Sequence, residues 1–273
     1  MCTNGIVDFS GKTLSDEDVK KCVKDLLKLV LEHDKLKRFR TEDSYLLRFL
    51  HCSEFDVSLA LKKMEDFTNL LLEYPDWFGN TSPLHMKSQI EVGDKVIMKE
   101  RDKKGRGILI LKLGKLDVVN SCPAEQARIV EVWMESIMDD PTIQASGLST
   151  ILDLNGYSWR LFRWVTPTNT KMVAKRVDTY PLKEILIHVV NTSFLLSATI
   201  KFIWPFLNDK LKNMFKFHFD NWPSLHEYIS PDVLPAEYGG DGPDINMEKS
   251  IQVLFDQDSS IGAKLIYHRI SDD

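Results

Sequence analysis

The chain has 273 residues, of which 43% are hydrophobic and 27% are charged, and its formal net charge is −5 at pH 7. This length and composition describe a folded protein with a sizeable core and exclude a disordered chain. The acidic balance argues against a general nucleic-acid binder, so we expect no nucleic-acid partner.

The N-terminal stretch MCTNGIVDFSGKTLSDEDVKK has neither a basic lead-in nor an apolar segment of signal-peptide length. The four cysteines lie far apart, without a CxxC pair or a metal-ligand spacing. The longest uncharged run, 185–200, is shorter than the ~20 apolar residues that a spanning helix needs. We therefore expect a cytoplasmic protein without a transmembrane segment, a metal site or a cofactor.

The first third of the chain has helical periodicity. Ser15 followed by three acidic residues predicts the start of one helix. A second helix, TEDSYLLRFLHC, is expected to be capped by Thr41, and a third is expected to run from Asp56 to Tyr74, where a proline follows. The sequence thus predicts a small all-helical N-terminal domain over residues 1–85.

Beyond about residue 91 the pattern alternates between strands and helices. Strands are predicted within 94–113 (two strands and a turn), 147–156, 183–191 and 213–219, and helices within 122–140, 166–181 and 193–207. The strand KEILIHVVN is almost continuously apolar, which is typical of a parallel strand covered on both faces. This order predicts an α/β sandwich with a mostly parallel sheet over residues 86–273.

The predicted helix at 193–207 is apolar on nearly all sides, and only Ser193, Ser197 and Lys201 form a polar stripe. Two interpretations stay open. The helix packs between the sheet and a neighbouring element, or it is a lid whose inner face covers an apolar ligand and whose outer face touches a membrane.

The positive charge around this helix favours the second interpretation, in which the helix meets a membrane surface. The segment 171–216 contains eight basic and three acidic residues, although the whole chain is acidic. Aromatic side chains at Trp204 and Phe206, followed by Lys210 and Lys212, are typical of peripheral proteins that meet the headgroup boundary.

Catalytic motifs are absent or incomplete in the sequence. GIVDFSGKT has five residues between its first glycine and Gly-Lys-Thr, where a P-loop has four. No GxSxG is present, and LHEY lacks the second histidine of HExxH. We therefore expect that the protein is not an enzyme.

Several segments, in order, carry a family resemblance: DSYLLRFLHCSEFDVSLALKKMEDF, TILDLNGYS, VTPTN, VDTYPLKEILIHVVN, PFLNDKLKNMFKFH and LHEYISPDVLPAEYGGD. Over roughly 43–241 the chain resembles the CRAL-TRIO (Sec14-like) domain and the helical domain that precedes it. Within this family it is most similar to the tocopherol-transfer and retinaldehyde-binding branch. The resemblance implies a monomeric carrier that binds one small lipophilic ligand under a mobile lid helix and moves it between membranes.

The resemblance also implies roles for individual residues. The predicted pocket lining is Trp133, Ile137, Ile151, Phe162, Val165, Val173, Tyr180, Ile187, Val189, Phe194 and Phe202. The predicted lid and membrane contacts are Ile203, Trp204, Phe206 and Leu207. A phosphoinositide or other anionic lipid is predicted to meet Lys62, Lys183, Lys210 and Lys212.

The basic cleft of tocopherol-transfer relatives is only partly kept, because Ser53, Ile185 and Met214 replace basic residues and Lys62 replaces an arginine. Lysine does not reproduce bidentate arginine–phosphate contacts, so we expect a weak attraction to anionic membranes. The sequence leaves the ligand open among retinoids, tocopherols, carotenoids and similar molecules. It also leaves open a regulatory or scaffold module that uses this fold for protein or phosphoinositide-membrane contacts.

Overall fold

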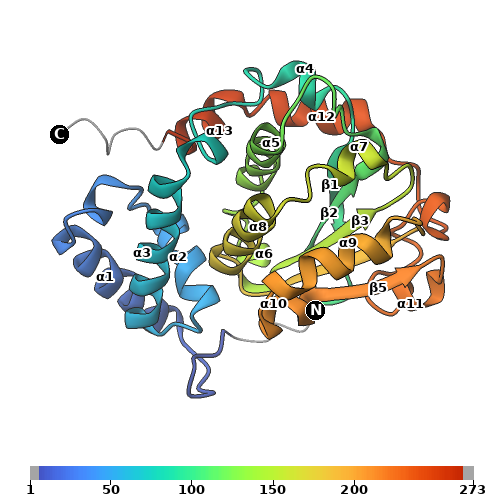
Figure 1. Cartoon of the computed structure of the whole chain (residues 1–273). Helices are drawn as coiled ribbons and strands as arrows, with labels where there is room; N and C mark the ends of the chain where they lie inside the picture. Colours follow the sequence, from blue (N-terminus) through green and yellow to red (C-terminus); the bar gives the residue numbers. More distant parts are fainter. Residues whose placement is uncertain (1–5, 267–273) are drawn as a thin grey trace.

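The computed structural model describes residues 6–266. The predicted fold class is confirmed, because a helical N-terminal region is followed by an α/β domain with a five-stranded, mostly parallel sheet. Figure 1 shows the N-terminal helices beside the sheet domain, with helices α5 (Pro123–Glu135) and α8 (Pro167–Thr179) between them and the sheet.

Three helices form the N-terminal region: α1 (Asp16–Glu32), α2 (Asp43–Cys52) and α3 (Val57–Glu73). A capping box starts α1, since Ser15 and Asp18 each accept a hydrogen bond from the other's backbone N–H. Asp56 caps α3 as predicted. The prediction for Thr41 is wrong, because α2 begins after Glu42 without a side-chain cap.

The apolar faces of these three helices pack into one buried cluster around Leu26, Phe49 and Phe67. Within the described residues, Met172 of α8 joins this cluster and Tyr180 packs against it. The helical region therefore rests on α8 through apolar contacts. The predicted division of the chain at residue 85 stays a prediction.

The sheet follows the order of the sequence. Its strands are β1 (Lys95–Arg101), β2 (Gly107–Lys112), β3 (Leu148–Asp153), β4 (Ile185–Val190) and β5 (Phe215–Phe219), arranged β1-β2-β3-β4-β5. β1 pairs antiparallel with β2, and the later neighbours are all parallel.

This order explains which face the helices cover. Crossovers between parallel strands are right-handed, so strands added one after another in one direction have all their connecting helices on the same face. The connecting helices are α5, α6 (Pro141–Ser146), α7 (Trp159–Phe162), α8, α9 (Leu196–Ile203) and α10 (Asp209–Met214). In Figure 1, α5, α8 and α9 lie over one side of the sheet.

The opposite face of the sheet is covered by the chain that follows β5. Leu225 of helix α11 (Trp222–His226) and, after this helix, Ile229, Leu234 and Tyr238 pack there on Ile151 and other strand residues. Helices α12 (Met247–Phe255) and α13 (Asp258–Lys264), which the sequence patterns did not predict, pack with α4 (Lys87–Ile90) and α5. The strands are thus covered on both faces, as the apolar strand 183–191 predicted.

A buried ion network ties the helical region to the sheet domain. The Arg48 guanidinium of α2 donates to Glu135 at 2.6 and 2.9 Å and to Asp139 at 2.6 Å. Arg40 donates to Glu135 at 3.2 Å, and Lys264 of α13 lies 2.7 Å from Asp139. Burial raises the pKa of Asp139, but the charges of Arg48 and Lys264 outweigh it and lower this pKa to about 2.

We predict that Asp139 makes the free energy of unfolding depend on pH in the acid range. Its pKa is depressed in the folded state, so its contribution is present above the ordinary value of 3.8 and is lost as pH falls from that value toward 2. Asp139→Asn should lower the free energy of unfolding by about 1 kcal/mol at pH 7, a figure reduced for partial solvent screening, and by about half as much at pH 3. Urea unfolding followed by tryptophan fluorescence measures both values.

The matched control is Asp209→Asn, whose carboxylate is exposed and lies 3.7 Å from Lys212. This variant should leave the unfolding free energy unchanged at both pH values. An Asp139→Asn deficit of the same size at pH 7 and pH 3 would contradict the assignment.

Candidate ligand-binding cavity

The helix-covered face of the sheet forms the floor of a cavity. Successive strand residues point to opposite faces, and the register places Leu109, Thr150 and Ile187 side by side on one of them. The floor residues are Leu109, Leu111, Leu148, Thr150, Leu152, Ile185, Ile187, Val189, Phe215 and Phe217. Alternation has therefore produced an almost wholly apolar surface.

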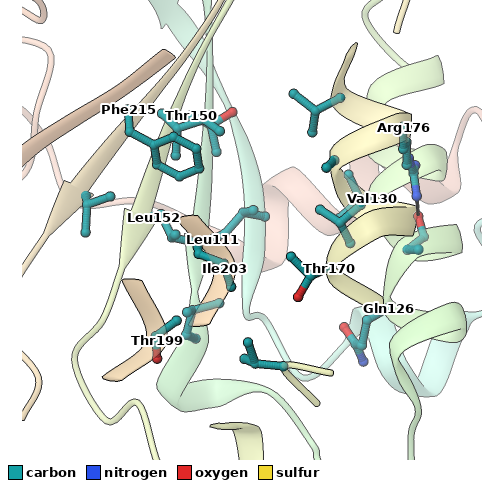
Figure 2. A pocket seen from close by; sticks show the side chains of 18 of the residues that line it. Leu111, Gln126, Val130, Thr150, Leu152, Thr170, Arg176, Thr199, Ile203 and Phe215 are labelled. Atoms are coloured by element: carbon teal, nitrogen blue, oxygen red, sulfur yellow. Dashed lines mark hydrogen bonds between the residues drawn. The ribbon is translucent and has the colours of Figure 1, made fainter. Parts of the chain in front are cut away.

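The walls of the cavity come from the crossover helices. Val130 and Met134 of α5 and Thr170, Val173 and Ala174 of α8 line one side. The other side is lined by α9 and the turn after it, through Leu196, Thr199, Ile200, Ile203 and Trp204. The volume of the cavity is about 510 Å³, which lies within the ~300–1,000 Å³ of small-molecule sites. Figure 2 shows Val130 and Thr170 facing Leu111, Leu152 and Phe215 across this space.

Helix α9 is shorter than predicted. It begins at Leu196 instead of Ser193, because Asn191 has a positive φ of 58° and the Ser193 hydroxyl accepts a hydrogen bond from the Leu195 N–H. The Thr199 hydroxyl of α9 donates to the Leu195 carbonyl just before the helix at 3.0 Å, and it lies 2.9 Å from the Tyr157 hydroxyl, a hydrogen bond that joins α9 to a distant segment. Apart from this bond, apolar contacts hold α9 over the cavity.

The segment after α9 turns inward. Trp204 packs on Phe215 and Phe217, with ring centroids 5.9 and 6.0 Å apart. Ile203, Trp204 and Leu207, predicted as lid and membrane contacts, line the cavity, and their contact with a membrane stays a prediction. Phe206 does not line it and lies 5.6 Å from the Lys171 ammonium.

Five of the eleven predicted lining residues lie at the cavity: Val165, Val173, Tyr180, Ile187 and Val189. Ile151 does not, because it lies in register with His188, one residue out of phase with Ile187, and so faces the opposite side of the sheet. Trp133 faces the C-terminal helices, and Ile137 packs beside the end of α5.

The other three placements are also corrected. Phe162 packs edge-on against Trp159 and does not contribute to the lining. Phe194 is 77% exposed, because it precedes the start of α9 and points away from the cavity. Phe202 is on the outer side of α9, where it is partly exposed, next to the cavity-lining Ile203.

Sequence reasoning missed Thr199 and Arg176 as polar lining residues. Thr199 forms the hydroxyl pair with Tyr157 described above, and burial raises the pKa of Tyr157. Arg176 lines the cavity but is held by Glu131 and donates to the Ala127 carbonyl at 2.9 Å. The alternation of residues along the strands is enough to predict the floor residues. No local sequence pattern predicts hydrogen bonds between distant segments, such as Tyr157–Thr199 and Arg176–Glu131.

A second polar group in the lining contains Lys95. Its ammonium lies 2.5 Å from Asp94 Oδ2 and 2.5 Å from Gln126 Oε1. Burial lowers the pKa of Lys95, and the Asp94 carboxylate opposes this shift. The described residues contain no group of three His, Cys, Asp or Glu side chains placed to hold a metal ion.

The predicted lipid-contacting lysines lie at the surface. Lys62 and Lys183 are exposed, Lys210 pairs with Asp178 at 2.6 Å, and Lys212 lies 3.7 Å from Asp209. Burial lowers the pKa of His51 to about 4, and the charge of Lys183 acts in the same direction, so Lys183 lies near the end of α2. Contact of these lysines with a lipid headgroup stays a prediction.

The match to a known domain decides the family. The model of the CRAL/TRIO domain matches residues 91–240, which is more than half of the chain. The chain belongs to the CRAL/TRIO family. Members of this family bind small lipophilic ligands and transfer lipids, and the matched region contains the whole sheet described above.

Named CRAL/TRIO relatives are similar over most of the chain. Clavesin-1 of Rattus norvegicus is 28% identical over 224 residues, 81% of this chain and 63% of the relative. Clavesin-2 of Homo sapiens is 25% identical over 240 residues, 86% of this chain and 73% of the relative. The chain thus spans less than two thirds of the length of clavesin-1. The narrower resemblance to tocopherol-transfer and retinaldehyde-binding proteins stays a prediction.

A solved structure supports the fold. The crystal structure of Sfh5 aligns with a TM-score of 0.55 at 13% identity and covers 88% of this chain and 92% of that chain. At this identity the likeness concerns the fold alone. Within residues 6–266, no helix is both long enough and apolar enough to cross a bilayer.

We predict that Thr150→Phe prevents an apolar ligand from entering this CRAL/TRIO cavity. The added ring extends from the centre of the floor into the enclosed space, so folding should persist while the bound or added lipid falls at least about fivefold. Organic extraction and mass spectrometry of the purified protein, followed by uptake of retinoids, tocopherols and carotenoids, measures the loss.

The control variant is Val119→Phe, which adds the same ring at a side chain that is 69% exposed. It should bind as the original protein does. Equal lipid content in Thr150→Phe and Val119→Phe would show that the ligand lies elsewhere.

Proposed function

We propose that this protein binds one small lipophilic molecule in the cavity and transfers it between membranes without changing it chemically. The single observation that carries the proposal is the apolar cavity of about 510 Å³ between the sheet and α5, α8 and α9. Removing apolar surface from water contributes ~25 cal/mol per Å², so a molecule that fills this space binds without many polar contacts.

Release requires a part of the wall to move, and α9 is the segment best suited to do so. Apolar side chains and the Tyr157–Thr199 hydrogen bond hold it over the cavity. Apolar contacts lose their advantage when the helix meets the apolar interior of a membrane, because neither arrangement exposes them to water. We therefore propose that α9 is the lid and that it opens at the membrane surface.

An exposed aromatic patch next to α9 suits such a surface. It consists of Trp159 and Phe194, with ring centroids 6.1 Å apart, and the half-buried Phe162 packs on Trp159 with ring centroids 5.3 Å apart. Trp159 is 57% exposed, and Arg160 and Arg163 are exposed on the same short segment. Aromatic rings with adjacent cations are suited to the boundary between headgroups and acyl chains.

The exposed lysines at 62 and 183 supply a second, weaker attraction in this proposal. Their long side chains act as point charges toward anionic lipids, at about 1 kcal/mol for each residue near the surface. The proposed site of action is the cytoplasmic face of membranes, where anionic lipids are concentrated.

We predict that the aromatic patch controls transfer. Trp159→Ser with Phe194→Ser should slow movement of the extracted ligand between anionic vesicles about tenfold or more, while equilibrium binding stays unchanged, because membrane affinity falls and the cavity is intact. A stopped-flow assay with donor and acceptor vesicles measures the rate.

The matched control is Leu31→Ser with Val253→Ser, which removes two exposed apolar side chains from α1 and α12. Its transfer rate should equal that of the original protein. If the original protein carries no lipid between vesicles, the carrier function is wrong and a scaffold role becomes the better explanation.

We further predict that Tyr157→Phe loosens the lid. Loss of one hydrogen bond of about 1 kcal/mol should speed ligand release about fivefold, because this bond is broken when α9 leaves the cavity. Tyr228→Phe, which removes the hydroxyl of a ring that packs on His188 at the opposite face of the sheet, should leave the release rate unchanged. Equal release rates for the two variants would exclude α9 as the moving segment.

A further inference from the structure

Lys95 is an ionisable side chain on an otherwise apolar floor. It lies directly opposite Leu111 in the antiparallel β1–β2 pair, and directly opposed residues point to the same face. Leu111 lines the cavity, and so does Lys95, which is only 4% exposed. Burying an ammonium costs several kcal/mol unless it is paired and hydrogen-bonded, so this position requires a specific explanation.

The partners of Lys95 hold its ammonium in place. Asp94, itself buried, accepts at 2.5 Å, and Gln126 of α5 accepts at 2.5 Å. The Gln126 amide is oriented from its other end, where Nε2 donates to the Ser121 hydroxyl at 3.0 Å. Gly93, at a φ of +69°, turns the chain between α4 and β1 immediately before this pair. Figure 2 shows Gln126 on the helical side of the cavity.

Other basic residues of the lining are already satisfied. Arg176 is paired with Glu131 and donates to the Ala127 carbonyl, and Lys112 donates to both Glu237 oxygens at 2.7 Å. An ammonium has three N–H donors. Asp94 and Gln126 accept from two of those on Lys95, and the third is available to an acceptor in the cavity.

The charge balance restricts which acceptor fits. Asp94 already neutralises Lys95, so a carboxylate from a ligand would add an uncompensated negative charge in an apolar cavity. A hydroxyl or carbonyl oxygen accepts the third N–H without adding charge. Asp94 therefore weakens the binding of ligands with a carboxylate, and Lys95 strengthens the binding of ligands with a hydroxyl or carbonyl oxygen.

We propose that Lys95, fixed by Asp94 and Gln126, anchors the polar end of a lipid whose single head group is a neutral oxygen, as in an alcohol, aldehyde or ketone, and that the site rejects the corresponding carboxylic acid. This inference rests on the proposed function, because it assigns the class of ligand to the same cavity.

The test compares two probes with the same carbon chain, hexadecan-1-ol and hexadecanoate, by displacement of Nile red at pH 8. The original protein should bind the alcohol about tenfold or more tightly than the acid. Lys95→Met should weaken alcohol binding about tenfold or more, because the charged donor is lost. Asp94→Asn should shift the alcohol-to-acid preference toward the acid about tenfold or more, because the charge of Lys95 is then unbalanced.

Control substitutions lie on the same strand. Lys99→Met and Glu100→Gln change exposed charges of β1 and should leave both affinities unchanged. Asp94→Asn keeps an oxygen acceptor for Lys95, so it decides the question even if Lys95→Met does not fold. Circular dichroism establishes which variants are folded.

The outcomes separate the two proposals. If the alcohol binds and neither Lys95→Met nor Asp94→Asn changes the alcohol-to-acid ratio, the anchor is wrong and the carrier function stands. If the original protein binds the acid as tightly as the alcohol, the rejection of carboxylates is wrong. If neither probe enters the original protein, the proposed carrier function fails, and the anchor fails with it.

Discussion

The sequential order of the five strands is the constraint on which the rest of the structure depends. Right-handed crossovers between successive parallel strands place α5, α8 and α9 on one face of the sheet. The cavity lies between that face of the sheet and these helices. The cavity is thus a consequence of topology, and its apolar floor is a consequence of strand alternation.

Buried charges are used in two different ways. The network around Arg48 joins α2, α5 and α13 outside the cavity, and each charge in it has a partner of opposite sign. The pair of Lys95 with Asp94 lies at the cavity itself and keeps a donor for a further acceptor. The first arrangement fixes the helical region on the sheet domain, whereas the second gives an apolar cavity a means of selection.

The cavity and the surface around it suit a carrier in complementary ways. The apolar side chains that hold α9 over the cavity in water stay shielded from water when the helix meets a membrane, and the rings of Trp159 and Phe194 are exposed beside α9. The same helix faces the cavity through Ile203 and the outside through Phe202. A segment in this position connects membrane contact with access to the ligand, which is the combination that a transfer protein requires.

The sequence by itself determined the fold class, the family and the order of the five strands with their main connecting helices, but not α12 and α13. Caps at Ser15 and Asp56, the prolines at 123 and 167 and the apolar strands are local signals, because each acts within a few residues of its own position.

Only the tertiary structure decided which residues face the cavity. Ile151 and Ile187 look alike as strand residues, but the register pairs Ile187 with Thr150 and sends Ile151 to the other face. Phe194, predicted to line the pocket, precedes the start of α9 and is exposed, whereas Trp204 lines the cavity. The hydrogen bond between Lys95 and Gln126 also could not be predicted. Contacts between distant segments depend on how the chain packs, and no local sequence pattern indicates them.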